Sequence, residues 1–208
     1  MPPSSVNLIL ADLPYGTTSM KWDSVIDLPT LWRRYTRLLA PGGCVVLFGS
    51  QPFTSNLILS NPEWFKYELI WEKNKCGSPG LAKFRPMKTH ENILVFAPGK
   101  TVYNPQMETG EPYSRQGSKK IRCNNHGYGF NTDNAIENTG TRYPKSIIGI
   151  RRDFSAQQQV HPTQKPVPLL EWLIATYSTT GDVVLDNAMG SGSTGVAALN
   201  LARKFIGV

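Results

Sequence analysis

The chain has 208 residues, is 40% hydrophobic and carries a formal net charge of +7. This length and apolar content allow one sizeable core, which excludes a disordered chain, and the positive charge favours an acidic partner such as nucleic acid. Three cysteines without a CxxC pair favour a reducing compartment over a disulfide framework, and no leader or membrane-spanning run is recognisable, so we expect a soluble cytoplasmic protein.

Strand and helix signals alternate through the first half of the chain. The branched apolar run at residues 6–11 predicts a buried strand, and helical spacing of apolar residues predicts a helix over 30–39. Residues 41–43, Pro-Gly-Gly, are expected to end that helix before a second buried strand at 44–48. Further strands are predicted at residues 65–72 and 92–96.

The second half begins with an irregular region at residues 99–150, which is rich in Gly, Asn, Thr and Tyr and reads as a loop-rich insertion with a surface function. After it the sequence predicts, in order, a helix, a strand, a helix and a strand at 168–177, 182–186, 196–203 and 205–208. Strands that alternate with helices predict one α/β domain over residues 1–208, with a mainly parallel twisted sheet and helices on both faces.

A glycine pattern follows the strand predicted at 182–186. Gly190, Gly192 and Gly195 form GxGxxG before a helix, where glycines let a ligand approach the backbone and its first N–H groups. A P-loop would need a lysine after the last glycine, and a dinucleotide site would need an acid about 20 residues on, beyond Val208. A tight strand–helix turn is the alternative, and we favour a cofactor that contains adenosine.

The segment "DLPY" follows the first predicted strand, at the sheet edge where ligands of parallel α/β proteins bind. Asp12 is a hydrogen-bond acceptor, Pro14 favours an extended Leu13 whose carbonyl can accept a second bond, and Tyr15 offers a ring for stacking. Two acceptors beside a ring suit the exocyclic amine of a nucleobase. A turn capped by Asp12 is the alternative interpretation.

Three motifs together resemble the DNA amino-methyltransferases of bacteria and phages. "DLPY" is similar to their Asp-Pro-Pro-Tyr motif, "DNAMGSGST" at 186–194 resembles their cofactor loop, and "HPTQKP" at 161–166 resembles the motif that precedes this loop. The order, with the catalytic motif first, is that of the permuted β class. The resemblance spans nearly the whole chain outside residues 99–150 and implies a Rossmann-like methyltransferase fold that uses S-adenosyl-L-methionine.

The resemblance also implies roles for individual residues. Asp12 and the carbonyl of Leu13 would receive the target amine, Pro14 would shape this segment, and the ring of Tyr15 would stack on the flipped base. Lys165 would reach the methionine carboxylate of the cofactor. The full set expected to hold the cofactor is Thr163, Gln164, Lys165, Asp186, Ala188, Gly190, Ser191, Gly192 and Ser193.

The sequence departs from the family pattern at several places. Leu13 stands where the family usually has proline, and Ala188 replaces a phenylalanine of the cofactor loop. The acid that binds the ribose hydroxyls in the family would fall just after Val208, and the chain begins almost at its first strand. A sheet that lacks one edge strand, with a weaker cofactor site, is therefore an open alternative.

A basic stretch lies between Tyr113 and Arg152, where eight basic residues are opposed only by Asp133 and Glu137, so that it carries +6 of the net charge of +7. Aromatic side chains are interspersed at Tyr128, Phe130 and Tyr143. We expect target recognition on DNA here, with a solvated polar loop as the alternative. Besides Arg115, the basic residues are Lys119, Lys120, Arg122, Arg142, Lys145, Arg151 and Arg152.

The predicted function is transfer of a methyl group from S-adenosylmethionine to adenine N6 in double-stranded DNA after base flipping, without a covalent intermediate or a metal. Aspartate at the start of the motif favours adenine over cytosine N4 by resemblance. The alternatives are a cytosine-N4 enzyme, a non-catalytic DNA-binding relative and, from GxGxxG alone, a nicotinamide dehydrogenase. Cys123 and His126 with Cys76 and His90 give only a weak zinc pattern, and a homodimer stays open.

Overall fold

The computed structural model describes residues 1–16, 26–77, 79–115, 136–151 and 164–208. These residues form two compact units, one made of Met1–Asn104 with Lys145–Val208 and the other of Pro105–Pro144. None of the helices in the described ranges is long and apolar enough to cross a membrane.

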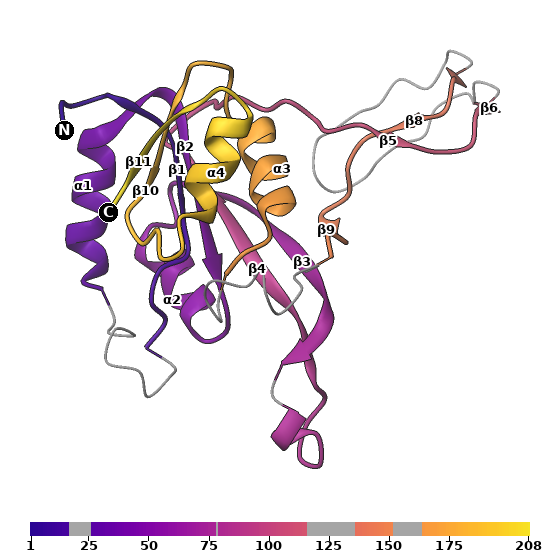
Figure 1. Cartoon of the computed structure of the whole chain (residues 1–208), viewed down its shortest axis with the longest axis horizontal. Helices are drawn as coiled ribbons and strands as arrows, with labels where there is room; N and C mark the ends of the chain where they lie inside the picture. The colour runs from indigo at the N-terminus through magenta and orange to yellow at the C-terminus, as the bar shows by residue number, and fades with distance from the viewer. Residues whose placement is uncertain (17–25, 78, 116–135, 152–163) are drawn as a thin grey trace. The chain divides into compact units, whose positions relative to one another are not determined.

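The first unit is built on a seven-stranded sheet (Figure 1). Its strands are β1 (Val6–Ala11), β2 (Leu39–Gly49), β3 (Phe65–Gly77), β4 (Lys88–Phe96), β9 (Ile147–Ile148), β10 (Val183–Asp186) and β11 (Lys204–Gly207). They lie in the order β11-β10-β1-β2-β4-β3-β9. The strands β11, β10, β1 and β2 pair in parallel, as β3 and β9 do, whereas β4 is antiparallel to both its neighbours. The predicted mainly parallel α/β sheet is therefore confirmed.

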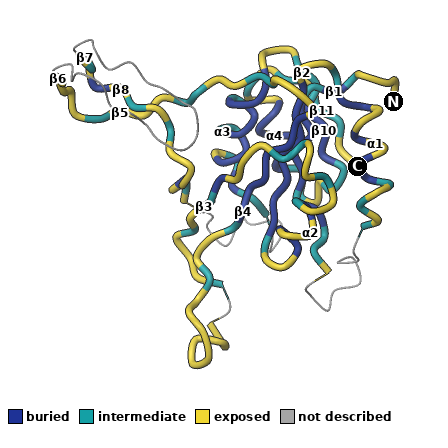
Figure 2. The backbone as a smooth tube through the Cα atoms, turned by 180° about the vertical axis from the view of Figure 1, so that it is seen from behind, coloured by how far each residue is buried: buried dark blue, intermediate teal, exposed yellow. Residues whose placement is uncertain are grey.

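Helices cover both faces of this sheet, and the core is split between the two faces. The helices are α1 (Leu28–Leu38), α2 (Phe53–Ser60), α3 (Val167–Tyr177) and α4 (Ser193–Asn200), and a 3₁₀ turn spans Pro79–Leu81. One cluster joins α1 and α2 to the sheet through residues such as Trp32 and Leu57, and the other joins α3 and α4 through residues such as Leu173 and Ala198. Figure 2 shows the central strands as the buried part of this unit.

Local sequence explains why α1 forms. Asp27 caps its N-terminus by accepting a hydrogen bond from the backbone N–H of Thr30 at 3.0 Å, and a proline occupies the first turn. Its buried residues are Leu31, Trp32, Tyr35 and Leu38, a spacing that places them on one face of a helix.

Several boundaries differ from the sequence predictions, and two of the differences have a local cause at glycines. The helix predicted over 196–203 begins earlier, because Gly192, with φ of +77°, ends the preceding loop directly before Ser193. Residues 41–43 do not separate helix from strand but lie inside β2, where its register against β1 shifts. Gly43 fits there because a Cβ would lie 2.7 Å from the carbonyl oxygen of Asn7. The helix α2 was not predicted at all.

The second unit consists of two short antiparallel pairs. β5 (Glu108–Thr109) pairs with β8 (Thr141–Arg142), and β6 (Tyr113–Arg115) pairs with β7 (Ile136–Asn138). Its range, Pro105–Pro144, falls inside the irregular region noted at residues 99–150, while the ends of that region belong to the first unit.

Candidate active site

The segment after β1 is held in place by its own side chains. Leu13 is buried and packs with the core cluster on the α1 and α2 face, which fixes the backbone between Asp12 and Pro14. The Tyr15 hydroxyl donates a hydrogen bond to Asp12 Oδ1 at 2.6 Å. The ring of Tyr15 stacks on Phe53 of α2, with 5.1 Å between ring centroids. The carboxylate therefore has a defined orientation at the end of its strand.

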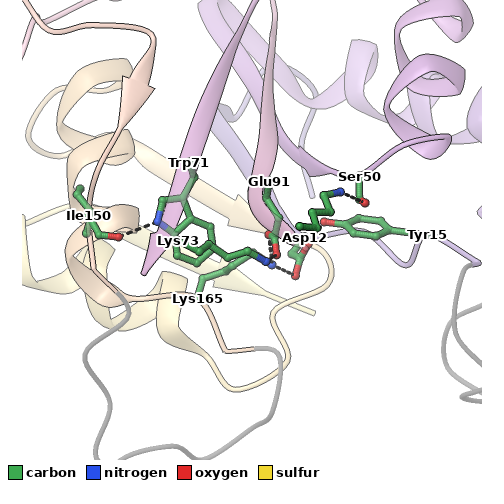
Figure 3. A network of polar contacts seen from close by, with 9 residues as sticks. Asp12, Tyr15, Ser50, Trp71, Lys73, Glu91, Ile150 and Lys165 are labelled. Carbon is green, nitrogen blue, oxygen red and sulfur yellow. Dashed lines mark hydrogen bonds and ion pairs between the residues drawn. The ribbon is translucent and has the colours of Figure 1, made fainter. Parts of the chain in front are cut away.

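Lys165 reaches this carboxylate from the segment that precedes α3 (Figure 3). Its Nζ lies 2.5 Å from Asp12 Oδ2 and 3.2 Å from Glu91 Oε2. It also lies 4.8 Å from the centroid of the Phe48 ring, on β2. Its side chain is only 10% exposed, so the ammonium is held by protein charges and an aromatic face more than by water.

Glu91 on β4 is paired on both sides. Its Oε1 accepts a hydrogen bond from Lys73 of β3 at 2.6 Å, and its Oε2 faces Lys165. Burial alone would raise the pKa of Glu91, but the charges of Lys165 and Lys73 outweigh it and hold the pKa below its ordinary value. Burial likewise acts to lower the pKa of Lys165, and Asp12 and Glu91 together raise it instead. Glu91 and Lys165 are therefore both charged at neutral pH.

The glycine loop follows β10, the strand beside β1. Asp186, at its start, is buried, and its Oδ1 accepts a hydrogen bond from the backbone N–H of Ala188 at 3.0 Å. Its Oδ2 accepts one from the Thr194 hydroxyl at 2.6 Å. Burial raises the pKa of this carboxyl, and the nearby charge of Asp12 adds to the rise. Asp186 therefore acts as an internal brace of the loop.

The loop leaves room and donors for a ligand. Gly190 and Gly192 have φ of +49° and +77°, a conformation that suits glycine, and a Cβ at Gly192 would meet nothing within 4 Å. No side chain caps α4, so its first turn presents backbone N–H groups that have no intrahelical partner. The Tyr35 hydroxyl bonds Asn187 at 2.6 Å, and the hydroxyls of Ser191 and Ser193 lie 2.9 Å apart. These features fit an adenosine-containing cofactor.

The structure brings together most residues predicted for the two motifs. Asp12, Tyr15 and Lys165 are in direct contact, and Asp186, Ala188, Gly190, Ser191, Gly192 and Ser193 form one loop. Gln164 adjoins Lys165, while Thr163 lies outside the described residues. Lys165 was predicted to bind the cofactor carboxylate, and in the structure it contacts Asp12 and Glu91, so that role stays a prediction.

Sequence reasoning missed Glu91, Lys73, Phe48 and Phe53. A signal was present for Glu91, because it is an acid at the start of the apolar run 92–96, a strand that crosses the middle of the sheet. Nothing in the sequence linked it to Asp12, since the two residues come from strands that are separated by β2 in the sheet.

The residues predicted to bind DNA have different environments. Lys145 and Arg151 are exposed in the first unit. Arg142 instead braces the second unit: its guanidinium bonds the Asn138 side chain and the Glu111 carbonyl, and lies 4.6 Å from the Tyr113 ring centroid. Lys119, Lys120, Arg122 and Arg152 lie outside the described residues.

The cysteines show no metal chemistry within the described ranges. No group of three or more potential ligands occurs there, and Cys123 and His126 fall outside them. Burial raises the pKa of the Cys44 thiol to about 12, so this side chain is protonated at neutral pH.

Comparisons with known proteins agree with this geometry. The family model described as DNA methylase, which covers N6 and N4 methyltransferases, matches residues 6–208. The chain belongs to this DNA methylase family. The family uses S-adenosyl-L-methionine as its methyl donor.

Individual relatives place the chain within the family. It is 28% identical over 221 residues to the Type II methyltransferase M.HpaI of Haemophilus parainfluenzae, a match that covers 99% of this chain and 64% of that protein. The chain thus spans just under two thirds of this relative. The crystal structure of an M1.HpyAVI–SAM complex is 28% identical, with a TM-score of 0.62, and the match covers 98% of this chain and 82% of that one.

A third comparison concerns the fold alone. PvuII DNA methyltransferase, described as cytosine-N4-specific, has a TM-score of 0.67 at 15% identity, and the match covers 100% of this chain and 76% of that one. The Rossmann-like methyltransferase fold is therefore confirmed.

Proposed function

We propose that this chain transfers a methyl group from S-adenosyl-L-methionine to adenine N6 in double-stranded DNA. The observation that carries the proposal is the ordered carboxylate of Asp12, held by Tyr15 and Lys165 at the strand end that adjoins the glycine loop. A fixed acceptor beside an aromatic ring suits the exocyclic amine of a base. Membership of the DNA methylase family identifies S-adenosyl-L-methionine as the methyl donor.

The protein's own residues would bind and orient the two reactants. Asp12 and the Leu13 carbonyl accept the two N–H bonds of the amine, which favours a tetrahedral nitrogen whose lone pair points at the methyl group. Tyr15 stacks on the base. This stacking helps to offset the cost of base flipping, which is roughly a few kcal/mol. The cofactor supplies an electrophilic methyl group. The loop from Asp186 to Ser193 and the segment 163–165 would hold it.

The DNA duplex would be held by the basic residues between Tyr113 and Arg152. Lys145 and Arg151 are exposed and suited to phosphate contacts, whereas Arg142 would act indirectly by bracing the second unit. Recognition of the target sequence by the second unit and by the basic residues outside the described ranges, and assembly as a homodimer, remain predictions.

The test is transfer of tritiated methyl groups from S-adenosylmethionine to unmethylated DNA, followed by separation of the modified nucleosides. The proposal expects label in N6-methyladenine, and loss of that label with Asp12→Asn. The matched control is Asp27→Asn, since Asn caps a helix as well as Asp and Asp27 lies at the start of α1.

The same experiment separates the alternatives. Label in N4-methylcytosine would show that the substrate is cytosine and not adenine. If the wild-type chain binds DNA but transfers no methyl group, the protein is a non-catalytic DNA-binding relative of these enzymes.

A further inference from the structure

We propose that Glu91 is a positioning residue, which sets the geometry of Asp12 by holding the ammonium group of Lys165 between two carboxylates. The inference rests on the proposed function in one respect: it gives Asp12 the role of acceptor for the target amine. Glu91 itself touches neither Asp12 nor the glycine loop in any contact that the described residues show.

The arrangement is a row of charges of alternating sign across the end of the sheet at which β1 finishes (Figure 3). It starts at Asp12 after β1, continues through Lys165 and Glu91, and ends at Lys73 on β3. In sheet order β2 and β4 lie between β1 and β3, and Phe48 of β2 places its ring beneath the ammonium of Lys165. The row therefore crosses four neighbouring strands.

Lys165 needs such a holder because its position is not fixed by its own chain. A lysine is a point charge on a flexible four-carbon stem, and an ammonium that is 10% exposed has lost most of its water. Tyr15 holds only Oδ1 of Asp12, so without a second holder Oδ2 and the ammonium could still shift together. A second carboxylate on a central strand, 3.2 Å from Nζ, fixes where the ammonium lies and therefore where Asp12 lies.

The two carboxylates do not hold Lys165 in the same way. Lys165 donates a hydrogen bond to Asp12 Oδ2, whereas Glu91 Oε2 has no hydrogen-bond partner among the described residues and attracts Lys165 as an ion pair. The hydrogen bond of Lys165 is thus made to Asp12, and Glu91 acts on the ammonium group through its charge. Lys73 fixes Glu91 through the other carboxylate oxygen, Oε1.

The variant that tests this is Glu91→Gln, which keeps the shape of the side chain and removes its charge. Lys73→Met is the second variant, because it removes the hydrogen bond that holds Glu91 on the side away from Asp12. The matched control is Glu171→Gln on α3, a partly buried glutamate that accepts a hydrogen bond from Asn200 at 2.7 Å. Each variant is assayed for the single-turnover methyl-transfer rate, for cofactor affinity by calorimetry and for DNA affinity.

We expect Glu91→Gln to lower the single-turnover rate on the order of 10²-fold, as misplacement by about 1 Å does, while DNA affinity is retained and cofactor affinity falls far less than the rate. Lys73→Met should give a smaller loss of the same kind, and Glu171→Gln none. Loss of affinity and rate in proportion, as general destabilisation would give, overturns the inference. So does a normal rate in Glu91→Gln.

A crystal structure of Glu91→Gln provides a reading that does not depend on activity. The inference expects Lys165 Nζ and the Asp12 carboxylate to have moved from their wild-type positions, and an unmoved pair overturns it. If the wild-type chain transfers no methyl group, the proposed function fails, and this structure still decides whether Glu91 positions Asp12.

Discussion

Two acids lie at the ends of neighbouring parallel strands and have different surroundings, Asp186 being buried and Asp12 partly exposed. Asp12, after β1, is held by the ammonium of Lys165 and the hydroxyl of Tyr15. Asp186, at the end of β10, accepts its hydrogen bonds among the described residues from neutral groups, the Ala188 backbone and the Thr194 hydroxyl. The same residue type in equivalent topological positions therefore serves two purposes.

The difference follows from where each acid receives its hydrogen bonds. Both oxygens of Asp186 are engaged by its own loop and helix, so that the acid stabilises a backbone shape. Asp12 is oriented by two side chains, Tyr15 from its own segment and Lys165 from the segment before α3, and a carboxylate can accept more hydrogen bonds than these two. The partners thus distinguish an acid that braces a loop from an acid paired with a cation, and it is the second that we propose receives the substrate.

The largest expected effect comes from replacing each of the two acids in turn and comparing the two variants. Asp12→Asn should lower the methyl-transfer rate by about 10³-fold with cofactor affinity nearly unchanged, because it removes an acceptor that acts on the reacting amine. Asp186→Ala should instead lower cofactor affinity by about 10- to 100-fold, because a buried N–H and hydroxyl lose their acceptor. Calorimetry and single-turnover kinetics on both variants check this. Equal effects of both variants on affinity would remove the distinction.

Removal of the cation beside Asp12 is expected to affect stability next. Lys165→Met leaves Asp12 and Glu91 as two partly buried carboxylates without their shared cation, which should cost about 2–4 kcal/mol in the free energy of unfolding, somewhat less than for a fully buried pair. Urea denaturation followed by circular dichroism measures it. Lys204→Met, at an exposed position on β11, is the control and should stay within about 0.5 kcal/mol of wild type. A loss as small as the control's would mean that water already screens the pair.

A smaller effect is expected on the loop side from Gly195→Ala. The added Cβ would lie 2.7 Å from the ring of Phe205, so α4 must shift against β11 at a cost of about 1–3 kcal/mol. Cofactor affinity should fall with it, while the contacts of Asp12 stay intact. Gly99→Ala, where a Cβ meets nothing within 4 Å, is the matched control for thermal denaturation. Wild-type stability in Gly195→Ala would show that the ring moves freely.

The smallest expected effect is a pair of opposite pH trends. The pKa of Glu91 is lowered by Lys165 and Lys73 despite its burial, so its ionised form stabilises the fold at neutral pH and this contribution is lost as pH falls below about 4. Burial raises the pKa of Asp186, so that acid favours the folded state in its protonated form and loses this advantage as pH rises through its raised pKa.

The unfolding free energies of wild type, Glu91→Gln and Asp186→Asn, measured by urea denaturation between about pH 3 and pH 8, test these trends. The difference between wild type and Glu91→Gln should shrink towards low pH, and the difference between wild type and Asp186→Asn should change in the opposite direction. Parallel trends would contradict the assignment of the two acids.

The sequence by itself determined the class of fold and both motifs. A short apolar run rich in branched residues, such as 6–11, favours a buried strand, and the glycines at 190 and 192 permit backbone angles that other residues avoid, so both features could be predicted from the sequence. The α2 helix was missed because its apolar residues show no clear helical spacing, and it packs on the sheet through Phe53 and Leu57.

Only the tertiary structure decided what surrounds Asp12. Glu91 and Lys165 are 74 positions apart in the printed numbering and meet because β4 inserts between β2 and β3 and the segment before α3 returns to the same edge. Local pattern cannot encode such a meeting, because charge pairing depends on distance in space and on the exclusion of water. The sequence thus indicated Asp12 and the glycine loop as candidate site residues, and the fold added the row of charges beside Asp12.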